Sequence, residues 1–534
     1  MTPPTGAAAE AQLVRIAIEL GAGEVGGPLS PAESALAEAS QTTSAPNARS
    51  LSRAAQAITD GGDPLGETLC TIRPPALRRP AGAFYTPAPV VEAMVDWALA
   101  PGPVRIVDPG CGSGRFCAQV ARRAREPEII AVDVDPVATL LTRAALAVLR
   151  PARAMVRQAD FTTVALSPAG GPTAFVGNPP YVRHHDLMPE AKARAAELGR
   201  RLGHRVPGLA GLHAHFFLAA AGQASPGDLL CFVTSSEWLD VGYGRLIREL
   251  LLDGLGVESL HLVDSRRAVF GDAQVTALIA CARVSSPEDS VRLRLLRGAD
   301  EVGSLAGGRP VARSLLRASR RWSHLFGAPP VEPSGSVVRL GSVARVRRGV
   351  ATGCNEFFVL TRDRARSLGL ERWCRPALTA GREILQAGGE VRDGPERKVL
   401  LDVARDVRPD AHPALLDYIR SGERRGVHRR YLCAHRRPWW SLGSPDAAPI
   451  VASYMARRPP AFARNPDRLA ILNVAHGIHP REPFTDEELA ALVATLNADR
   501  SSFWGRGRRY QGGLEKFEPR EMEDLPTAWS GRGS

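Results

Sequence analysis

The amino-acid sequence predicts an α/β protein: a doubly wound sheet of seven strands, followed by a C-terminal domain of mixed α and β structure. Two observations predict this fold class. Between residues 104 and 283, short apolar runs ending in aspartate or asparagine alternate with helical patterns, as in strand–helix–strand units. After about residue 310 this alternation stops, and short strands, prolines and arginine clusters follow. We therefore expect an N-terminal extension over residues 1–75, an α/β domain over 76–310 and a separate domain over 311–534.

The composition bounds the kind of protein and its partners. A chain of 534 residues is long enough for two or three domains with sizeable cores. The net charge of +12 favours a polyanionic partner. Lysine occurs only at Lys192, Lys398 and Lys516, and alanine, proline and glycine are abundant, which indicates coding bias in a GC-rich genome. A single arginine pair is therefore weak evidence of binding, whereas the overall excess still counts.

The cysteines and the apolar segments suggest the compartment. The eight cysteines include no C-x-x-C pair, so the sequence predicts neither a zinc site nor a disulfide framework. The N-terminus lacks the basic and apolar regions of a signal peptide, and no apolar run reaches membrane-spanning length. We therefore expect a cytoplasmic protein that binds neither a metal nor a membrane.

The first segment, residues 1–75, is rich in alanine, proline, serine, threonine and glycine. This composition predicts one short helix around residues 12–20 and a linker or loosely ordered chain over residues 28–63. We assign no chemistry to this segment. After it, Thr86 and Pro87 predict the start of an amphipathic helix that runs to Leu99, with the Thr86 hydroxyl as its N-cap.

A strand, a glycine-rich turn and a helix then follow one another. Residues 104–108 form an apolar run that ends at Asp108, and Gly110, Gly112 and Gly114 lie in the turn before a helical pattern. Such a unit binds nucleotides, because glycines let the backbone pass close to a ligand. No Gly-Lys-Ser/Thr follows, so the turn is not a phosphate-binding P-loop.

Two further strand ends carry acidic groups. The run over residues 129–132 ends at Asp133, nineteen residues after Gly114, where a carboxylate meets ribose hydroxyls in such folds. The next strand ends at Asp160 and Phe161. There the carboxylate can accept a hydrogen bond from an adenine amino group while the ring stacks beside it. Dehydrogenases share the glycine turn and the first acidic strand end.

The stretch with the most specific chemistry is Asn178-Pro179-Pro180-Tyr181, which follows the apolar run over residues 173–176. The two prolines fix φ and lack N–H donors, so nearby carbonyls can point outward without a competing donor. Asn178 adds a side-chain carbonyl acceptor beside them. Two acceptors and an aromatic ring together suit a planar group with an exocyclic amine.

The rest of the α/β domain completes the predicted seven strands. A buried helix is expected over residues 212–221 and a strand over 229–234, and residues 260–263 and 274–282 form a closing antiparallel hairpin. His213 and His215 lie in the expected helix. Because no companion ligands accompany them, we interpret both as packing or surface groups.

The C-terminal part mixes glycine turns, apolar strands and arginines. A glycine turn leads into an apolar strand over residues 349–360, and arginines interleave with aromatic residues at 429–431, 436–440 and 503–510. Phosphate contacts plus base stacking explain this mixture. Surface arginine from GC-biased coding explains it equally well, so both interpretations stay open.

Residues 82–283 resemble the DNA adenine-N6 methyltransferases of the γ motif order, a class of S-adenosylmethionine-dependent restriction–modification enzymes. The order of glycine loop, acidic strand end, Asp-Phe and Asn-Pro-Pro-Tyr on successive strands carries the resemblance and separates a methyltransferase from a dehydrogenase. Residues 340–526 resemble the C-terminal target-recognition (specificity) domains of these enzymes, through Thr352-Gly353-Cys354-Asn355 and Gly512-Gly513-Leu514. The resemblance implies a seven-stranded Rossmann-like methyltransferase sheet and S-adenosylmethionine as cofactor. It also implies site-specific methylation of a flipped adenine in double-stranded DNA, in restriction–modification or phage defence.

The resemblance further implies a role for each site residue. In the catalytic set, Asn178 and Pro179 accept hydrogen bonds from the adenine amine, Pro180 stiffens the turn, and Tyr181 and Phe270 stack on the flipped base. The cofactor set is implied to contact successive parts of S-adenosylmethionine. Thr86 contacts its carboxylate, and Asp108 and Gly110, with Gly112 and Gly114 of the loop, contact its methionine end. Asp133 contacts its ribose, and Asp160 and Phe161 contact its adenine. One departure is His213, which stands where an aromatic residue is common.

Three alternatives share parts of this pattern. A glutamine methyltransferase acting on release factors has Asn-Pro-Pro-Tyr but does not need a long C-terminal domain. An RNA methyltransferase fits the charge, and a non-catalytic DNA-binding subunit is disfavoured because the site residues are intact. Cytosine-C5 chemistry requires a cysteine nucleophile, and no Pro-Cys dipeptide occurs. Glu190-x-Lys192 and Glu396-x-Lys398 lack the acidic partner of a nuclease site, so we expect no fused nuclease.

We expect a monomeric methyltransferase that acts alone or with a cognate restriction endonuclease or defence complex.

Overall fold

The computed structural model describes residues 6–78, 82, 85–263, 276–284, 288–327, 337–443, 447–510 and 514–529. Contacts divide the chain into two compact units, Met1–Phe326 and Gly327–Ser534. The boundary therefore lies after Phe326 rather than near residue 310, and the first unit includes the N-terminal segment. Trp322 explains the later boundary, because its ring is buried against that of Trp238, with the two ring centroids 6.2 Å apart.

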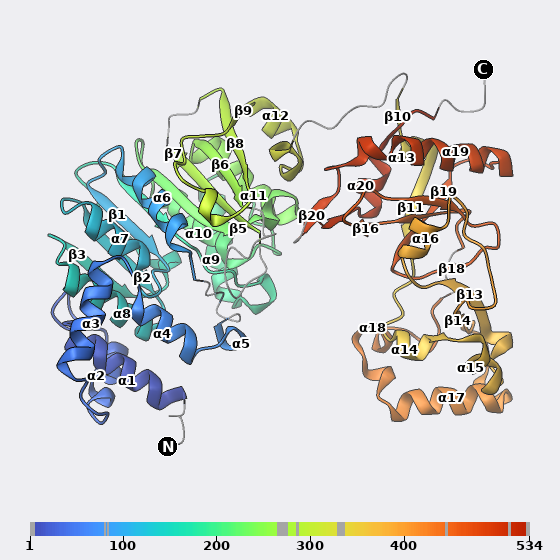
Figure 1. Ribbon diagram of the computed structural model, residues 1–534, viewed down its shortest axis with the longest axis horizontal. Helices are drawn as coiled ribbons and strands as arrows, with labels where there is room; N and C mark the ends of the chain where they lie inside the picture. Colours follow the sequence, from blue (N-terminus) through green and yellow to red (C-terminus); the bar gives the residue numbers. More distant parts are fainter. Residues whose placement is uncertain are drawn as a thin grey trace. The chain divides into compact units, whose positions relative to one another are not determined.

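A nine-stranded, mostly parallel sheet forms the centre of the first unit (Figure 1). Its strands are β1 (Arg105–Pro109), β2 (Glu128–Asp133), β3 (Ala154–Gln158), β4 (Thr173–Gly177), β5 (Leu229–Ser235), β6 (Val257–Val263), β7 (Ala277–Arg283), β8 (Ser290–Leu296) and β9 (Arg309–Ala312). The spatial order is β3-β2-β1-β4-β5-β7-β6-β8-β9. Strands β1 to β5 are parallel, and β7 is antiparallel to both β5 and β6. The carboxyl ends of the parallel strands β1 to β5 therefore lie at one edge of the sheet, where a ligand binds in such folds.

The sheet has two more strands than the seven predicted, so the predicted width is wrong while the α/β class is confirmed. Strand β8 runs parallel to β6, and β9 pairs antiparallel with β8. The buried Val291 and Leu293 of β8 alternate with the half-buried Arg292 and Arg294, as in a strand with one face in the core. Since the described residues between β7 and β8 form no helix, the strand–helix alternation used for the prediction does not reach β8.

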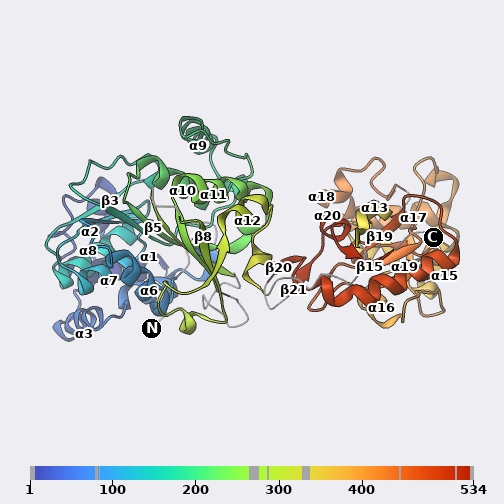
Figure 2. The same ribbon diagram turned by 90° about the horizontal axis from the view of Figure 1, so that it is seen from above.

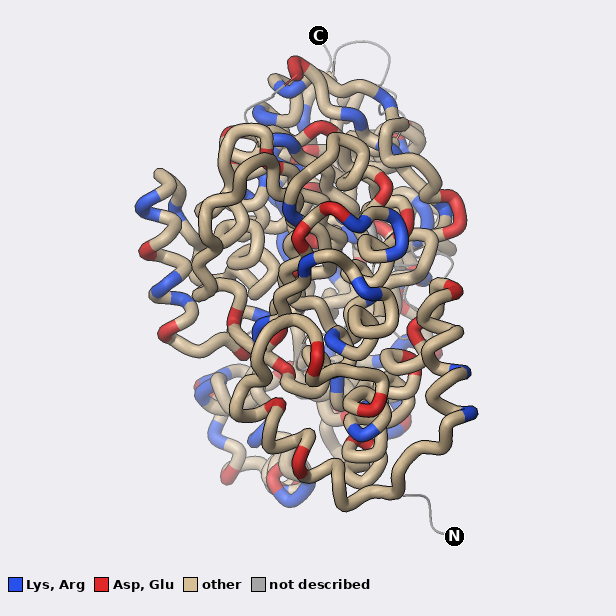
Figure 3. The backbone as a smooth tube through the Cα atoms, turned by 90° about the vertical axis from the view of Figure 1, so that its left-hand side faces the viewer, with Lys and Arg blue, Asp and Glu red and all other residues tan. Residues whose placement is uncertain are grey.

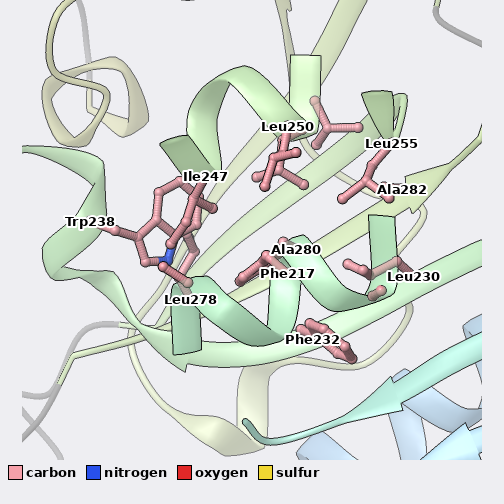
Figure 4. Close-up of a cluster of buried hydrophobic side chains, with 14 of the residues drawn as sticks. Phe217, Leu230, Phe232, Trp238, Ile247, Leu250, Leu255, Leu278, Ala280 and Ala282 are labelled. Carbon is pink, nitrogen blue, oxygen red and sulfur yellow. The ribbon is translucent and has the colours of Figure 1, made fainter. Parts of the chain in front are cut away.

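Helices cover both faces of the sheet. On one face lie α6 (Ala88–Leu99), α7 (Arg115–Arg123) and α8 (Pro136–Leu149), and on the other α10 (Leu212–Gln223) and α11 (Arg245–Glu249). Successive strand residues face opposite cores: Ile106 packs with α6 and α7, whereas Val107 packs with α10. Figure 4 shows the second core, where Phe217 of α10 lies against Phe232 and Trp238. Burying one side chain of this size stabilises the fold by about 1.5–3 kcal/mol.

The N-terminal segment is helical, with α1 (Gly6–Glu19), α2 (Pro31–Ser40), α3 (Ala48–Thr59), α4 (Pro64–Ile72) and α5 (Pro75–Arg78). Helix α1 confirms the helix predicted at residues 12–20. The prediction of loosely ordered chain over residues 28–63 is wrong, because α2 and α3 occupy it. Ser30 begins α2 with a capping box completed by Glu33, and Asn47 caps α3. These local signals outweigh the composition on which the prediction relied.

A buried ion pair joins this segment to the sheet domain. Arg143 of α8 and Glu33 of α2 are 1 % and 0 % exposed, with Nε and Oε1 2.9 Å apart. Arg143 also donates to the carbonyls of Val25, Gly27 and Val156, so the guanidinium is fully used in hydrogen bonding. Because a buried charge is tolerated only with such partners, this contact defines where the N-terminal helices sit.

The second unit is a mixed α and β structure (Figure 2). One sheet has the order β11-β19-β15-β17, formed by Ala344–Arg348, Ala475–Pro480, Ile450–Ser453 and Phe462–Arg464. A second has the order β12-β14-β13-β18, formed by Val359–Leu360, Val399–Leu401, Cys374–Leu378 and Ala470–Ile471. The longer helices are α17 (Pro413–Arg424) and α19 (Asp486–Ala498), and α14 is the short turn Asn355–Phe358. This unit confirms the predicted change from strand–helix alternation to short strands.

Within the part of the chain that the structure describes, no helix is long and apolar enough to cross a membrane. Over the same residues, no group of three or more His, Cys, Asp and Glu side chains could hold a metal ion.

Candidate active site

Asn178 follows directly on β4, next to β1 in the sheet. Its Nδ2 donates to the Thr86 hydroxyl oxygen across 3.1 Å. This contact corrects the predicted role of Thr86 in helix α6, because the N-cap of α6 is Pro87 and makes no side-chain capping bond. The Thr86 hydroxyl, 4 % exposed, therefore orients the Asn178 carboxamide instead of capping a helix.

Tyr181 lies at the end of the same turn. Its N–H donates to the Gly82 carbonyl at 3.1 Å, and a Cβ on Gly82 would lie 2.4 Å from the Tyr181 nitrogen, so only glycine permits this approach. The Tyr181 ring meets His213 of α10 edge to face, with centroids 6.4 Å apart. Burial raises the pKa of the Tyr181 phenol, so the ring is neutral at ordinary pH. His213 is buried beside it, and burial lowers its pKa to about 4, which makes it a neutral packing group as predicted.

The three glycines of the turn after β1 all have positive φ values. Gly110, Gly112 and Gly114 have φ values of 83°, 55° and 86°, in the region that side chains with a Cβ disfavour. Gly110 donates to the Val132 carbonyl at 2.7 Å, which fixes the turn against β2. A Cβ on Gly114 would lie 2.9 Å from the Thr142 hydroxyl, so this glycine lets the turn pack on α8.

Asp108 belongs to β1, just before this turn, and is completely buried. Its Oδ2 accepts from the Cys117 thiol at 3.4 Å, while Oδ1 has no partner among the described residues. Burial raises the pKa of Asp108 to about 8, and the nearby charge of Asp133 adds to the shift. A Cβ on Gly177 would lie 2.7 Å from Oδ1, so the end of β4 leaves space for this carboxyl. A buried acceptor without a partner fits the ammonium group of a methionine-type ligand.

Asp133 ends β2 on the far side of the turn. Its two oxygens accept from the backbone N–H groups of Gly112 and Asp135, each at 2.9 Å. Burial raises the pKa of this carboxyl as well. The glycine turn and the acidic strand end are thus bonded to each other, as expected for one ligand-binding edge.

The third predicted pair behaves differently. Asp160 accepts from the Thr162 N–H at 2.9 Å and from Arg194 at 3.2 Å, so it caps a short turn after β3. Phe161 is 2 % exposed and packs on Phe216, with ring centroids 5.4 Å apart. Its ring is therefore packed in the core, and its place beside the cofactor adenine stays a prediction. Phe270, the second expected stacking ring, lies outside the described residues.

Two residues at this site were missed by the sequence analysis. Arg115, at the start of α7, lies over the Tyr85 ring at 3.5 Å and donates to the Thr86 carbonyl. Asp63, the N-cap of α4, accepts from Arg115 and from Ser113. The only sequence signal for Asp63 is that it precedes Pro64, a pattern typical of helix starts.

The second unit contains a cleft of about 400 Å³. It is lined by the turn Thr352–Glu356 that the sequence singled out, with Arg430 and Asn473. Thr352 donates to Asn355 Oδ1 at 2.5 Å, and Arg436 donates to the Thr352 carbonyl at 2.7 Å, so the turn is braced from behind. Tyr431, which follows Arg430 in the chain, is 75 % exposed, and its ring centroid lies 4.4 Å from that of His435.

The basic excess of the protein is unevenly distributed. Residues 327–534 contain 34 Lys and Arg against 25 Asp and Glu, a net charge of +9 out of +12 for the whole chain. Figure 3 marks these basic and acidic positions along the backbone. The second unit therefore accounts for most of the attraction to a polyanion.

A mostly parallel sheet of this order, with a glycine turn after β1, carboxyls at the ends of β1 and β2, and Asn-Pro-Pro-Tyr after β4, defines an S-adenosylmethionine-dependent methyltransferase. Models of known families agree with this class along the chain. The model for N-6 DNA methylases matches residues 74–194 and that for the Eco57I restriction-modification methylase residues 153–270. The model for the C-terminal domain of the type II methyltransferase M.Eco57I matches residues 330–531.

Known proteins resemble the chain over most of its length. The type II methyltransferase M.XamI of Xanthomonas campestris pv. amaranthicola is 39 % identical over 450 residues, 83 % of this chain and 84 % of that protein. M.AccI of Acinetobacter calcoaceticus is 24 % identical over 466 residues, 83 % and 85 % of the two chains. The fold matches the solved structure of the type IIL restriction-modification enzyme MmeI in complex with DNA, with a TM-score of 0.57 and 14 % identity over 85 % of this chain and 69 % of that one.

The chain therefore belongs to the Eco57I-type restriction-modification methylases, and it is a type II DNA adenine-N6 methyltransferase. The predicted class, activity and cofactor are confirmed. This membership decides against the RNA, glutamine and non-catalytic alternatives.

Proposed function

We propose that the enzyme methylates an adenine flipped out of double-stranded DNA, that Asn178 and the Pro179 carbonyl activate the amine, and that residues 327–534 recognise the target sequence. The observation that carries the catalytic part is the Thr86–Asn178 hydrogen bond. It fixes the donor end of the carboxamide, so the acceptor end has one orientation. This orientation is what an exocyclic amine requires of its partner.

The residues around the glycine turn fit the cofactor. When bound, S-adenosylmethionine supplies an electrophilic methyl group on a sulfonium, so no covalent nucleophile is required. We assign Asp108 to its ammonium group, because the buried Oδ1 has no hydrogen-bond partner in the part of the chain that the structure describes. Asp133 is assigned to the ribose hydroxyls, since it follows β2 beside the glycine turn. Asp160 and Phe161 are assigned to the adenine end by the resemblance alone.

The protein's contribution to the chemistry is alignment and electrostatics. The adenine amine is a poor nucleophile, because its lone pair is delocalised into the ring. Hydrogen bonds from its two N–H groups to Asn178 Oδ1 and the Pro179 carbonyl localise the lone pair. If the amine took the methyl group from the bound cofactor, which would leave as a neutral thioether, the nitrogen would become positive and the two acceptors would stabilise that charge. One amine proton would then leave to solvent, and a neutral N6-methylamino group would remain on the adenine.

Base flipping is required because of where the adenine amine lies in a duplex. A duplex hides the adenine amine in the base stack, so the nucleotide must rotate out and lose its stacking. Tyr181 is assigned to replace part of that stacking, because its ring follows the turn that carries Asn178. Phe270 is assigned the same role on the other face by the resemblance.

The second unit is assigned to DNA contact because of its charge and its cleft. Its net charge of +9 neutralises phosphates, a contribution that holds a duplex without reading its sequence. Arg430 lines the cleft and the exposed Tyr431 follows it in the chain, and an arginine near an aromatic ring suits a nucleotide through charge and stacking. A cognate restriction endonuclease is the partner from which such methylation protects the host.

Sequencing of methylated bases in DNA from cells that express the protein tests this proposal. We expect N6-methyladenine to occur in one short sequence. We also expect the purified protein to methylate a DNA duplex with this sequence and not the RNA of the same sequence. Methylation scattered over unrelated adenines would contradict site-specific recognition. Equal activity on RNA would contradict the duplex substrate.

A further inference from the structure

We infer that the N-terminal helices form part of the methyl-transfer site, with Asp63 and Arg115 as positioning residues that act on Asn178 through Thr86. The inference rests on the proposed role of Asn178. Three consecutive contacts, each between segments far apart in the sequence, carry it.

The first contact joins the N-terminal helices to the glycine turn. Asp63 caps α4 through Oδ1, which accepts from the Gly66 N–H at 2.8 Å. Its Oδ2 accepts from the Ser113 hydroxyl at 2.5 Å and from Arg115 Nε at 3.1 Å. The Asp63 side chain is only 11 % exposed, so water competes weakly for these bonds. One carboxylate therefore ties a helix of the N-terminal segment to the turn that faces the cofactor.

The second contact carries the link from Asp63 to residues 85 and 86. Arg115 uses Nε for Asp63 and Nη1 for the Thr86 carbonyl, and its guanidinium plane lies 3.5 Å above the Tyr85 ring. The side chain is 17 % exposed. A guanidinium bound on three sides has one geometry, because its donors form a rigid fork. Asp63 thus determines where Arg115 holds the chain just before α6.

The third contact reaches the catalytic turn. The Thr86 hydroxyl accepts from Asn178 Nδ2, so its own proton remains a donor for a cofactor carboxylate. Because Pro87, the N-cap of α6, makes no side-chain capping bond, the helix start does not itself fix Thr86. Arg115 and Asn178 supply that support. Loss of Asp63 would therefore reorient Arg115, Thr86 and the Asn178 acceptor in turn, and small misplacements of this kind reduce the rate steeply.

Steady-state methyl transfer with the full-length protein tests the inference, at saturating S-adenosylmethionine and duplex DNA. The variants are Asp63→Asn, which keeps the shape and removes the charge, Thr86→Val, which keeps the shape and removes the hydroxyl, and Thr86→Ser, which keeps the hydroxyl. Asp60→Asn is the matched control, an acid three residues away whose side chain accepts a hydrogen bond from Gln56. We expect kcat to fall about tenfold in Asp63→Asn and at least as far in Thr86→Val, with KM for DNA unchanged. Thr86→Ser and Asp60→Asn keep most of the wild-type kcat.

A double variant separates positioning from stability. If Asp63 acts through Thr86, adding Asp63→Asn to Thr86→Val causes little further loss of kcat. Wild-type kcat in either single variant, or two losses that multiply in the double variant, overturns the inference. A lower melting temperature with wild-type kcat in Asp63→Asn also overturns it, because the helices then only stabilise the fold. Asn178→Ala in the same assay isolates the proposed function: activity there contradicts the role of Asn178, whereas an inactive Asn178→Ala beside a normal Asp63→Asn contradicts the inference alone.

Discussion

Asn178 Nδ2 donates to Thr86 Oγ1 across 3.1 Å, joining two residues that stand 92 positions apart in the chain. The contact links the turn after β4 to the chain before α6, so a residue expected to meet the cofactor and a residue expected to meet the base share one hydrogen bond. Changes at this pair are therefore expected to alter the rate of methyl transfer more than the binding of DNA.

Cofactor binding is expected to release a proton from Asp108. Burial raises its pKa from 3.8 to about 8, so the carboxyl is mostly protonated at pH 7 in the cofactor-free protein. A ligand ammonium beside it favours the charged form, and binding should then release close to one proton. Calorimetry in two buffers of different ionisation enthalpy measures this number. Asp108→Asn should release none, and equal release by both proteins would remove Asp108 from the cofactor site.

The same shift gives a stability prediction. The folded pKa of Asp108 lies above its unfolded value, so between about pH 4 and 8 the folded state binds more protons than the unfolded state. The contribution of this residue to the free energy of unfolding is then present at low pH and lost as the pH rises towards 8. Denaturant unfolding of wild type and Asp108→Asn across this range checks the sign, and the difference between the two should grow with pH in favour of the variant.

Removing Glu33 should destabilise the first unit strongly. Glu33→Ala leaves Arg143 as a buried charge without its partner, and the expected loss in the free energy of unfolding is about 3–5 kcal/mol. Glu38→Ala, at an exposed position of the same helix, is the control and should change little. Chemical unfolding followed by circular dichroism measures both. Equal stability of the two variants would mean that the ion pair does not hold the N-terminal helices.

Arg430→Ala should weaken DNA binding in a salt-dependent way. Loss of one phosphate contact reduces the slope of log affinity against log salt by about one, and weakens binding to all duplexes alike. Arg408→Ala, an exposed arginine of the same unit that does not line the cleft, serves as the control. Fluorescence anisotropy over a salt series distinguishes them. An unchanged slope in Arg430→Ala would place the DNA elsewhere on this unit.

The two halves can also be tested apart. A truncated chain ending at Phe326 keeps β9, Trp322 and the whole cofactor site, whereas an end near residue 310 would cut into β9. We expect it to bind S-adenosylmethionine with unchanged affinity and to lose tight, selective binding of duplex DNA. Filter binding to several duplexes measures the affinity and the sequence selectivity of the truncated chain. Selective binding by the truncated chain would mean that the second unit is not the reader.

Local patterns predicted the glycine turn and the strands whose ends carry Asp133 and Asn178, whereas long-range packing was not predicted. Gly110 to Gly114, Asp133 and Asn178 were recognised because each ends a short apolar run, and strand ends of a parallel sheet meet at one edge. The helices α2 and α3 were not predicted, because the prediction used the alanine- and serine-rich composition and did not consider the N-caps. Each N-cap accepts a hydrogen bond from a residue only three positions later. No sequence pattern reveals that Asp63, Arg115 and Thr86 touch, since these contacts depend on how three segments fold onto one another. The burial of Phe161 likewise follows from the neighbouring rings of Phe175 and Phe216.

The central claim is that Asn178 activates the adenine amine, and Asn178→Ala tests it most directly. The measurement is the rate of tritiated methyl transfer to target duplex, together with the affinity for S-adenosylmethionine by calorimetry. Since the lost interaction forms fully only in the transition state, we expect the barrier to rise by about 2.7–4 kcal/mol or more, a rate loss of about a hundredfold or greater, with cofactor affinity nearly unchanged. Turnover near the wild-type rate in this variant would contradict the account.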